Sequence, residues 1–168
     1  MVDQNTQNKK IGNEVSLRNV TESDLDLFFR IQLDKEANYM AAFTSRDPSD
    51  REAFDKHWKK ILSNPDIVNK TILFENSVVG HIAKFTSEDK PEITYWIDKE
   101  HWGKGVATRA LNQFLKIITI RPLYARVAKD NIRSNRVLEK SGFVIIGENK
   151  GFAEGRGQET EEFIRILK

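Results

Sequence analysis

The chain has 168 residues, of which 39% are hydrophobic and 31% charged, and it contains no cysteine. This length fits one domain, and ten Phe and three Trp are enough aromatic residues for a core, which excludes disorder of the whole chain. The lack of cysteine excludes disulfides, thiolate metal sites and a cysteine nucleophile, and we expect a reducing, cytoplasmic location. No apolar stretch approaches the roughly 18 residues of a membrane-spanning helix, and a net charge of +2 argues against a general nucleic-acid binder.

The positive charge is concentrated in one part of the chain. Residues 99–140 carry ten basic and three acidic side chains, a net charge of +7. Such a stretch is compatible with a solvated helical face. It is equally compatible with a local binding site for an anionic ligand.

In the first half of the chain, residues 1–13 are polar, lack the apolar segment of a signal peptide and are predicted to form a flexible tail. One domain is predicted over residues 14–168. A capping box, Ser49-x-x-Glu52, predicts the start of a helix that ends before Pro65. The segment 36–47 has no clear period. The other elements predicted here are a strand at 14–19, a helix from Thr21 to about residue 34 with Asp24 in an imperfect capping box, and strands at 71–75 and 78–85 joined at Asn76-Ser77.

The second half alternates strands and helices. After a polar loop at 86–91, the pattern predicts a strand at 92–98, an amphipathic helix at 104–118, a strand at 123–128, a short helix from Ile132 to Ser141 with Asn131 as N-cap, a strand at 143–147, a Gly-rich connection at 147–157 and a strand at 161–167. This order predicts one α/β domain around a mixed sheet. Its middle strand–helix–strand unit is predicted to be a right-handed crossover between parallel strands.

A glycine-containing turn, Trp102-Gly103-Lys104-Gly105-Val106-Ala107, lies between the strand and the helix of that unit. Glycines allow close backbone approach to a ligand, and the N–H groups and dipole of a helix start favour phosphate. Lys104 adds a positive charge. The alternative is a tight turn with no ligand.

Known phosphate loops match this turn to different degrees. The spacing of a Walker A loop is absent. A dinucleotide-binding loop requires a third glycine, where this chain has Thr108, although the acidic Asp130 follows the next strand. A dinucleotide-binding loop also follows the first strand of its sheet, whereas at least four predicted strands precede this loop. An NAD(P)-dependent oxidoreductase is therefore the less favoured alternative.

The loop resembles the pyrophosphate loop of the GNAT N-acetyltransferases, whose consensus is Gln/Arg-x-x-Gly-x-Gly/Ala. Trp102 stands at the first position, Gly105 at the central glycine and Ala107 at the last. The surrounding string YWIDKEHWGKGVATRAL and the segment DNIRSNRVLEKSGF, residues 130–143, resemble the RimJ/RimL-like branch of that superfamily. The resemblance covers roughly residues 14–168. It implies a three-layer fold with a mixed, mostly antiparallel sheet and acetyl-CoA bound where strands 92–98 and 123–128 splay apart.

The resemblance also implies roles for individual residues in holding acetyl-CoA. Loop N–H groups would bind the pyrophosphate, the strand edge 95–98 would pair with the pantetheine arm, and Asn131 would hydrogen-bond that arm as well as, or instead of, capping its helix. Arg136, with Arg133 and Lys129, is a candidate for the 3′-phosphate region, where solvated helix charge is the alternative. The cofactor-binding residues expected are Tyr95, Ile97, Trp102, Gly103, Lys104, Gly105, Val106, Ala107, Thr108, Asn131 and Arg136.

The implied chemistry is direct attack of an amine on a thioester in a ternary complex, with an oxyanion donor on strand 92–98 near Ile97. The tyrosine that serves many family members as general acid is replaced by Leu138. A serine has that role in RimL-like enzymes, so Ser134 is the candidate acid, with water as the alternative. Glu92 is the candidate base, with an exposed strand-end charge or a water relay as the alternatives.

The sequence therefore predicts an acetyl-CoA-dependent N-acetyltransferase whose acceptor is a primary amine, either a protein N-terminus or a small molecule. A GNAT module that binds acetyl-CoA without catalysis is the alternative from another class. No metal is expected, because His57, His81 and His101 lack ligand spacing. We expect a monomer or homodimer, with no nucleic-acid or membrane partner. The sequence does not identify the amine.

Overall fold

The computed structural model describes residues 14–168, so the tail predicted over 1–13 lies outside the described residues. One seven-stranded sheet runs through the domain in the order β1-β2-β3-β4-β5-β7-β6. Among the strands of residues 14–168, only the β4–β5 pair is parallel, so the predicted mixed, mostly antiparallel sheet is confirmed. The strands are β1 (Val15–Asn19), β2 (Val68–Phe74), β3 (Ser77–Ser87), β4 (Lys90–Ile97), β5 (Leu123–Ala128), β6 (Val144–Ala153) and β7 (Gln158–Leu167).

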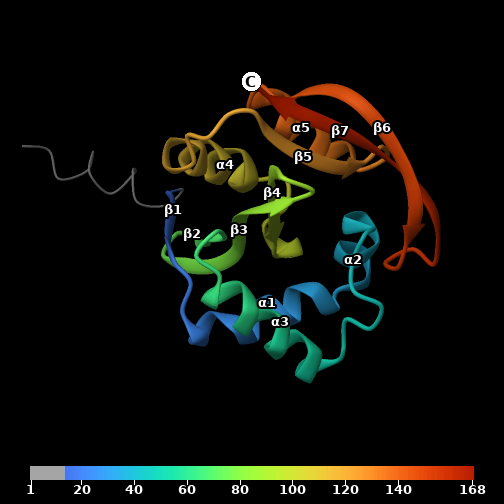
Figure 1. The fold of residues 1–168 in the computed structure, drawn as a ribbon. Helices are drawn as coiled ribbons and strands as arrows, with labels where there is room; N and C mark the ends of the chain where they lie inside the picture. The colour runs from blue at the N-terminus through green and yellow to red at the C-terminus, as the bar shows by residue number, and fades with distance from the viewer. Residues whose placement is uncertain (1–13) are drawn as a thin grey trace, which may run out of the picture.

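Helices lie on both faces of this sheet (Figure 1). The α-helices are α1 (Leu25–Leu33), α2 (Lys35–Ala41), α3 (Arg51–Ser63), α4 (Val106–Ile117) and α5 (Ile132–Lys140). Two 3-10 turns, η1 (Glu22–Asp24) and η2 (Lys99–His101), precede α1 and the glycine loop. In Figure 1, α4 lies above strands β1–β4, and α1 and α3 lie below them.

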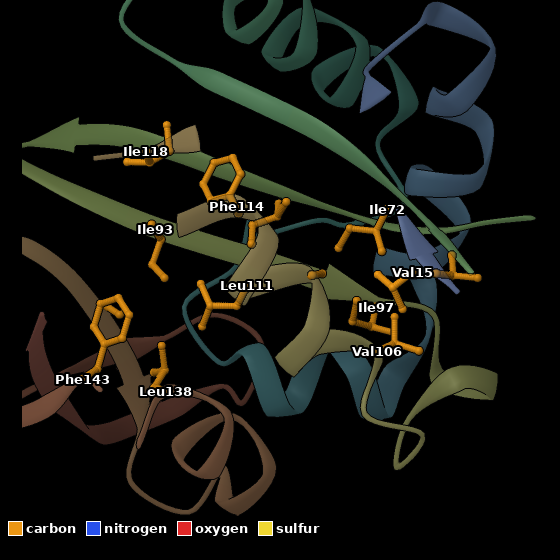
Figure 2. Packing of buried hydrophobic residues seen from close by; sticks show 14 of the residues in the cluster. Val15, Ile72, Ile93, Ile97, Val106, Leu111, Phe114, Ile118, Leu138 and Phe143 are labelled. Carbon is orange, nitrogen blue, oxygen red and sulfur yellow. The ribbon is translucent and has the colours of Figure 1, made fainter. Parts of the chain in front are cut away.

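The main core lies between α4 and the sheet. The helix repeat of 3.6 residues brings Ala110, Leu111 and Phe114 onto one face, and all three are fully buried. Figure 2 shows Leu111 and Phe114 directed toward the sheet residues Ile72 and Ile93. This packing anchors α4, and with it the loop that precedes the helix.

A second, aromatic core lies on the opposite face of the sheet. Phe28 of α1 packs against Trp58 of α3 with 5.2 Å between ring centroids, and His81 of β3 lies 4.5 Å from Phe28. Trp96 of β4 packs against the same cluster. Neighbouring residues of β4 therefore face different helices, because side chains alternate across a strand.

Several helix starts differ from the prediction, and α4 begins at Val106 rather than at residue 104. Asp50, not Ser49, caps α3: its carboxylate accepts a hydrogen bond from the Ala53 N–H at 2.9 Å. The segment without a clear period contains α2, which begins after Asp34, whose carboxylate accepts from the Ala37 N–H at 2.8 Å. At seven residues, α2 is too short to reveal a 3.6-residue period in the sequence.

Several strand boundaries also differ from the prediction. The β2–β3 turn is formed by Glu75 and Asn76, both with positive φ, rather than by Asn76-Ser77. The polar loop predicted over 86–91 is shorter than expected. The turn between β3 and β4 consists of Glu88 and Asp89, both with positive φ. The Gly-rich connection predicted over 147–157 is mostly strand, because β6 extends to Ala153 and pairs with β7 up to Gln158.

The parallel pair determines where a ligand can enter the sheet. The register of β4 with β5 consists of one pair among the described residues, Glu92 with Tyr124. Beyond that pair the strands diverge toward their carboxyl ends, as predicted for this crossover. Within residues 14–168, no helix is both long and apolar enough to cross a bilayer.

Candidate functional site

A cavity of about 140 Å³ occupies the gap where β4 and β5 diverge. Its walls come from β4, β5, α2 and α5. They include Ile93, Tyr95, Trp96, Ala125, Val127, Asn131 and Ser134. The predicted catalytic Ser134 and two of the predicted cofactor-binding residues, Tyr95 and Asn131, are thus brought together at this gap.

The glycine loop adopts a conformation that only glycine takes up readily. Gly103 and Gly105 have φ angles of 75° and 74°, in the left-handed region, and Gly105 is the N-cap of α4. A Cβ added at Gly103 would meet nothing within 4 Å, and one at Gly105 would meet only the Arg109 guanidinium at 3.9 Å. The space above the loop is therefore open. The first N–H groups of a helix have no partner within the helix, so those of α4 are available to an anion.

Trp102 connects this loop to the gap. Its indole Nε1–H donates to the Ile97 carbonyl at 2.8 Å, and the guanidinium of Arg133 on α5 lies over its ring at 5.3 Å. The carboxyl end of β4, the loop and the first turn of α5 are therefore held as one unit. Val106 points the other way and is buried in the main core, whereas Lys104 is exposed and Ala107 and Thr108 are half-buried.

The backbone of β4 directs hydrogen-bonding groups toward the gap. The Asp98 N–H donates to the Val79 carbonyl at 2.7 Å. Because residues of an antiparallel ladder alternate between facing the partner strand and facing away, the N–H and C=O groups of Tyr95 and Ile97 are directed away from β3. The contact of the Ile97 carbonyl with Trp102 agrees with that direction. The Ile97 N–H thus lies on the side of β4 expected for an oxyanion donor.

A pair of hydroxyl groups spans the gap. Tyr95 Oη lies 2.7 Å from Ser134 Oγ. Burial raises the pKa of Tyr95 to about 12, although the hydrogen bond with Ser134 opposes the change. The phenol is therefore protonated at neutral pH and can donate to the serine. No sequence pattern indicates this pair, because the two residues are 39 positions apart.

Asn131 is engaged at both ends of its amide. Its Oδ1 accepts from the Ser134 N–H at 3.2 Å, which confirms the predicted N-cap, and its Nδ2 donates to the Met40 carbonyl at 3.2 Å. The first contact fixes the turn that carries Ser134. The second attaches α2 to the wall of the gap.

Glu92 lies at the opposite end of β4 from Ile97. Its buried carboxylate accepts a hydrogen bond from Arg126 Nε at 2.9 Å, and Arg126 also reaches Glu162 at 3.3 Å. The alternative of an exposed strand-end charge is therefore wrong, since Glu92 is buried in an ion-paired cluster. Its role as a base stays a prediction.

The basic stretch is only partly neutralised by neighbouring carboxylates. Lys129 pairs with Glu148 at 2.8 Å and Glu161 at 3.2 Å, so it is committed to the β6–β7 hairpin. Lys104, Arg133 and Arg136 are exposed, and none of them forms an ion pair within the described part of the chain. These three residues leave a positive surface beside the loop and α5.

A larger cavity, of about 560 Å³, lies on the α1 and α3 side of the sheet. Phe43 and Trp96 line both this cavity and the gap. His57 and His81 belong to the larger cavity, and burial lowers the pKa of both, that of His81 to about 3. Within residues 14–168, no three His, Asp or Glu side chains gather closely enough to hold a metal ion.

Residues 14–144 match the model of the family described as "Acetyltransferase (GNAT) domain". Among curated proteins, the chain is 26% identical over 146 residues to "Uncharacterized protein MJ1062" of Methanocaldococcus jannaschii, covering 80% of this chain and 29% of that protein. It is 26% identical over 117 residues to "Putative ribosomal N-acetyltransferase YdaF" of Bacillus subtilis, covering 63% of this chain and 64% of that protein. The chain thus spans less than two thirds of either relative.

Among solved structures, the fold is similar to Mycobacterium smegmatis RimJ in complex with CoA-disulfide. The TM-score is 0.76 at 22% identity, over 91% of this chain and 81% of that one. Because the sequence identity is only 22%, this similarity shows a shared fold and nothing further.

Proposed function

The chain belongs to the acetyltransferase (GNAT) family, and on that premise we propose that it is an N-acetyltransferase that uses acetyl-CoA to acetylate a primary amine. The observation that carries the proposal is the gap between β4 and β5, which opens beside the glycine loop at the start of α4. An unpaired strand edge next to a helix N-terminus suits an elongated ligand with an amide-containing arm and a pyrophosphate.

Different residues of the site would bind different parts of acetyl-CoA. N–H groups of residues 103–108 would bind the pyrophosphate, with Lys104 nearby, and Trp102 would hold the loop against β4. The edge of β4 at Tyr95 and Ile97 would pair with the pantetheine arm. Arg133 and Arg136 would contact the 3′-phosphate of acetyl-CoA. Acetyl-CoA supplies an acetyl group activated as a thioester.

The chain's own groups would act on the transfer in three ways. The Ile97 N–H would donate to the carbonyl oxygen under attack, where negative charge develops. Ser134 Oγ would protonate the departing sulfur, and the Tyr95 hydroxyl, 2.7 Å away, would at the same time supply a proton to the serine and regain one from water. A direct attack needs the amine in its neutral form, and Glu92, or a water relay in its place, would take up the proton that the amine loses.

The loop assignment is tested by the substitution Gly105→Asp. A carboxylate at this helix start repels a pyrophosphate, and the left-handed φ adds strain, so acetyl-CoA binding measured by calorimetry is expected to be lost. Gly157→Asp is the matched control, because Gly157 also has a left-handed φ of 63° and open space at its Cβ, but lies in the β6–β7 turn. Full acetyl-CoA affinity in the Gly105 variant would overturn the loop assignment.

Thiol release from acetyl-CoA in the presence of amines separates an enzyme from a binding module. Amine-dependent release supports the proposed transfer. Acetyl-CoA binding without release for any amine would instead favour a module that has lost catalysis.

A further inference from the structure

We infer that the amine acceptor is a small monoamine with an aromatic or otherwise apolar body, bound in the larger cavity between β3, α1 and α3. This inference rests on the proposed N-acetyltransferase function. The volume of about 560 Å³ lies within the roughly 300–1,000 Å³ usual for small-molecule pockets.

The position of the cavity suits an acceptor. Phe43 and Trp96 line both this cavity and the β4–β5 gap, so the two spaces adjoin at these aromatic side chains. An amine bound with its body in the larger cavity can present its nitrogen at that junction. In the transfer, the nitrogen forms a bond to the acetyl carbon while the carbon–sulfur bond breaks. The amine loses one proton and the sulfur gains one, giving an amide and a free thiol.

The lining of the cavity is mainly aromatic and apolar. Six aromatic side chains face it from α1, α3, β3, β4 and the loop after α2, and two imidazoles join them. These residues are Phe28, Phe43, Phe54, Trp58, Phe85 and Trp96, with His57 and His81. Flat apolar walls of this kind favour a planar or aliphatic body through area burial and ring stacking.

The charges on the cavity are few and already committed. Its only carboxylates among the described residues are Asp47 and Asp50. Asp47 accepts from the Ser49 N–H and hydroxyl at 3.0 and 2.6 Å, and Asp50 accepts from the Ala53 N–H at 2.9 Å. Both residues are exposed, so they belong to the open side of the cavity. A polyamine or an aminoglycoside carries several positive charges, and this lining offers no buried carboxylate for them.

Among the described residues, the cavity also lacks a lysine or arginine that would form an ion pair with an acidic ligand. His81 contributes an uncharged ring, packed 4.5 Å from Phe28 and 5.1 Å from Trp58. A monoamine without a carboxylate therefore fits the chemistry of the walls better than an amino acid does.

The test compares amines in a thiol-release assay with the full chain and acetyl-CoA. We expect kcat/KM for 2-phenylethylamine or tryptamine to exceed that for spermidine and for a peptide with a free N-terminus by roughly tenfold or more. Equal or higher values for spermidine or the peptide would overturn the substrate class while leaving the transferase intact. Acetyl-CoA binding without thiol release for any of these amines would overturn the proposed function itself.

A pair of variants tests the location. Ala53 of α3 lines the cavity from an exposed position, so Ala53→Trp is expected to fill part of it and raise KM for the aromatic amine about tenfold, with unchanged acetyl-CoA affinity. Lys59→Trp, on the same helix but away from the cavity, should leave KM unchanged. An unaltered KM in the Ala53 variant would overturn the assignment of this cavity as the acceptor site.

Discussion

At the scale of single residues, the hydroxyl pair at the gap gives the sharpest prediction. Ser134→Ala removes the proposed proton donor and is expected to lower kcat by about a hundredfold with little change in acetyl-CoA affinity. Tyr95→Phe keeps the ring packing and should cause a smaller loss, because water can resupply the serine. Steady-state kinetics of thiol release measure both effects.

Ser141→Ala serves as the control for this pair. Ser141 is the C-cap of α5, at the opposite end of the helix from Ser134, and its hydroxyl donates to Asn112 Oδ1 at 3.2 Å, away from the gap. Its removal should leave kcat unchanged. An unchanged kcat in the Ser134 variant would exclude the serine as the acid and leave water in that role.

Sequence reasoning reached Ser134 but not its partner, and the difference has a physical origin. Ser134 belongs to a local segment, DNIRSNRVLEKSGF, that can be identified from neighbouring letters. Tyr95 gains its relation to Ser134 only when β4 and α5 meet across the gap. Glu92 shows the same limit, because its partner Arg126 lies on another strand and its burial depends on the assembled sheet.

At the scale of elements, the start of α1 is attached to the sheet through one buried carboxylate. Asp24 is 3% exposed and accepts hydrogen bonds from Arg18 at 2.7 and 2.8 Å, from the Thr71 hydroxyl at 2.7 Å and from the Thr21 N–H at 2.9 Å. Burial alone would raise the pKa of Asp24, but these bonds outweigh it and lower the pKa to about 2.

Asp24→Asn is therefore expected to lower the free energy of unfolding by about 2–3 kcal/mol in urea denaturation at pH 7, because it weakens charge-assisted bonds in a buried place. Asp26→Asn provides the comparison. Asp26 is 81% exposed and pairs with Arg51 at the surface, so its loss should cost less than about 1 kcal/mol. Equal losses in the two variants would contradict the role given to the Asp24 cluster.

The elements themselves were predictable where the periodicity was strong. The amphipathic α4 and the strand β5 follow from their patterns, and β5 has the predicted bounds Leu123–Ala128. The β6 strand was predicted too short because most of its residues are exposed and it contains Gly147 and Gly151. An exposed strand has no buried face to impose alternation, so its pairing with β7 leaves little trace in the sequence.

At the scale of the whole molecule, β4 separates two spaces of different character. The gap side has the loop, the exposed basic residues and the backbone edge, whereas the other side has the aromatic cavity. Only part of the net charge of +7 over residues 99–140 is therefore available near the loop. Lys99, Arg126 and Lys129 pair with carboxylates, and the remainder includes the residues beside the loop. Charge counting located the region, but only the fold shows which carboxylates Lys99, Arg126 and Lys129 contact.

The aromatic cavity also links the site to the stability of the whole domain through His81. Burial lowers the pKa of His81 from 6.5 to about 3, so between these pH values the unfolded chain binds a proton that the folded chain does not. Stability must therefore fall as the pH falls through this window, by at most about 1.4 kcal/mol per pH unit. Asp24 acts in the same direction, but only between about pH 3.8 and 2.

Urea denaturation at pH 7 and pH 5 checks this expectation. The free energy of unfolding should fall by about 2 kcal/mol between the two, mainly through His81, with a smaller contribution from His57, whose pKa is also lowered by burial and by Lys60. His81→Phe keeps a ring against Phe28 and Trp58 but cannot take up a proton, so most of the pH dependence should disappear. If the free energy of unfolding falls equally between pH 7 and pH 5 in wild type and variant, a group other than His81 binds the proton on unfolding.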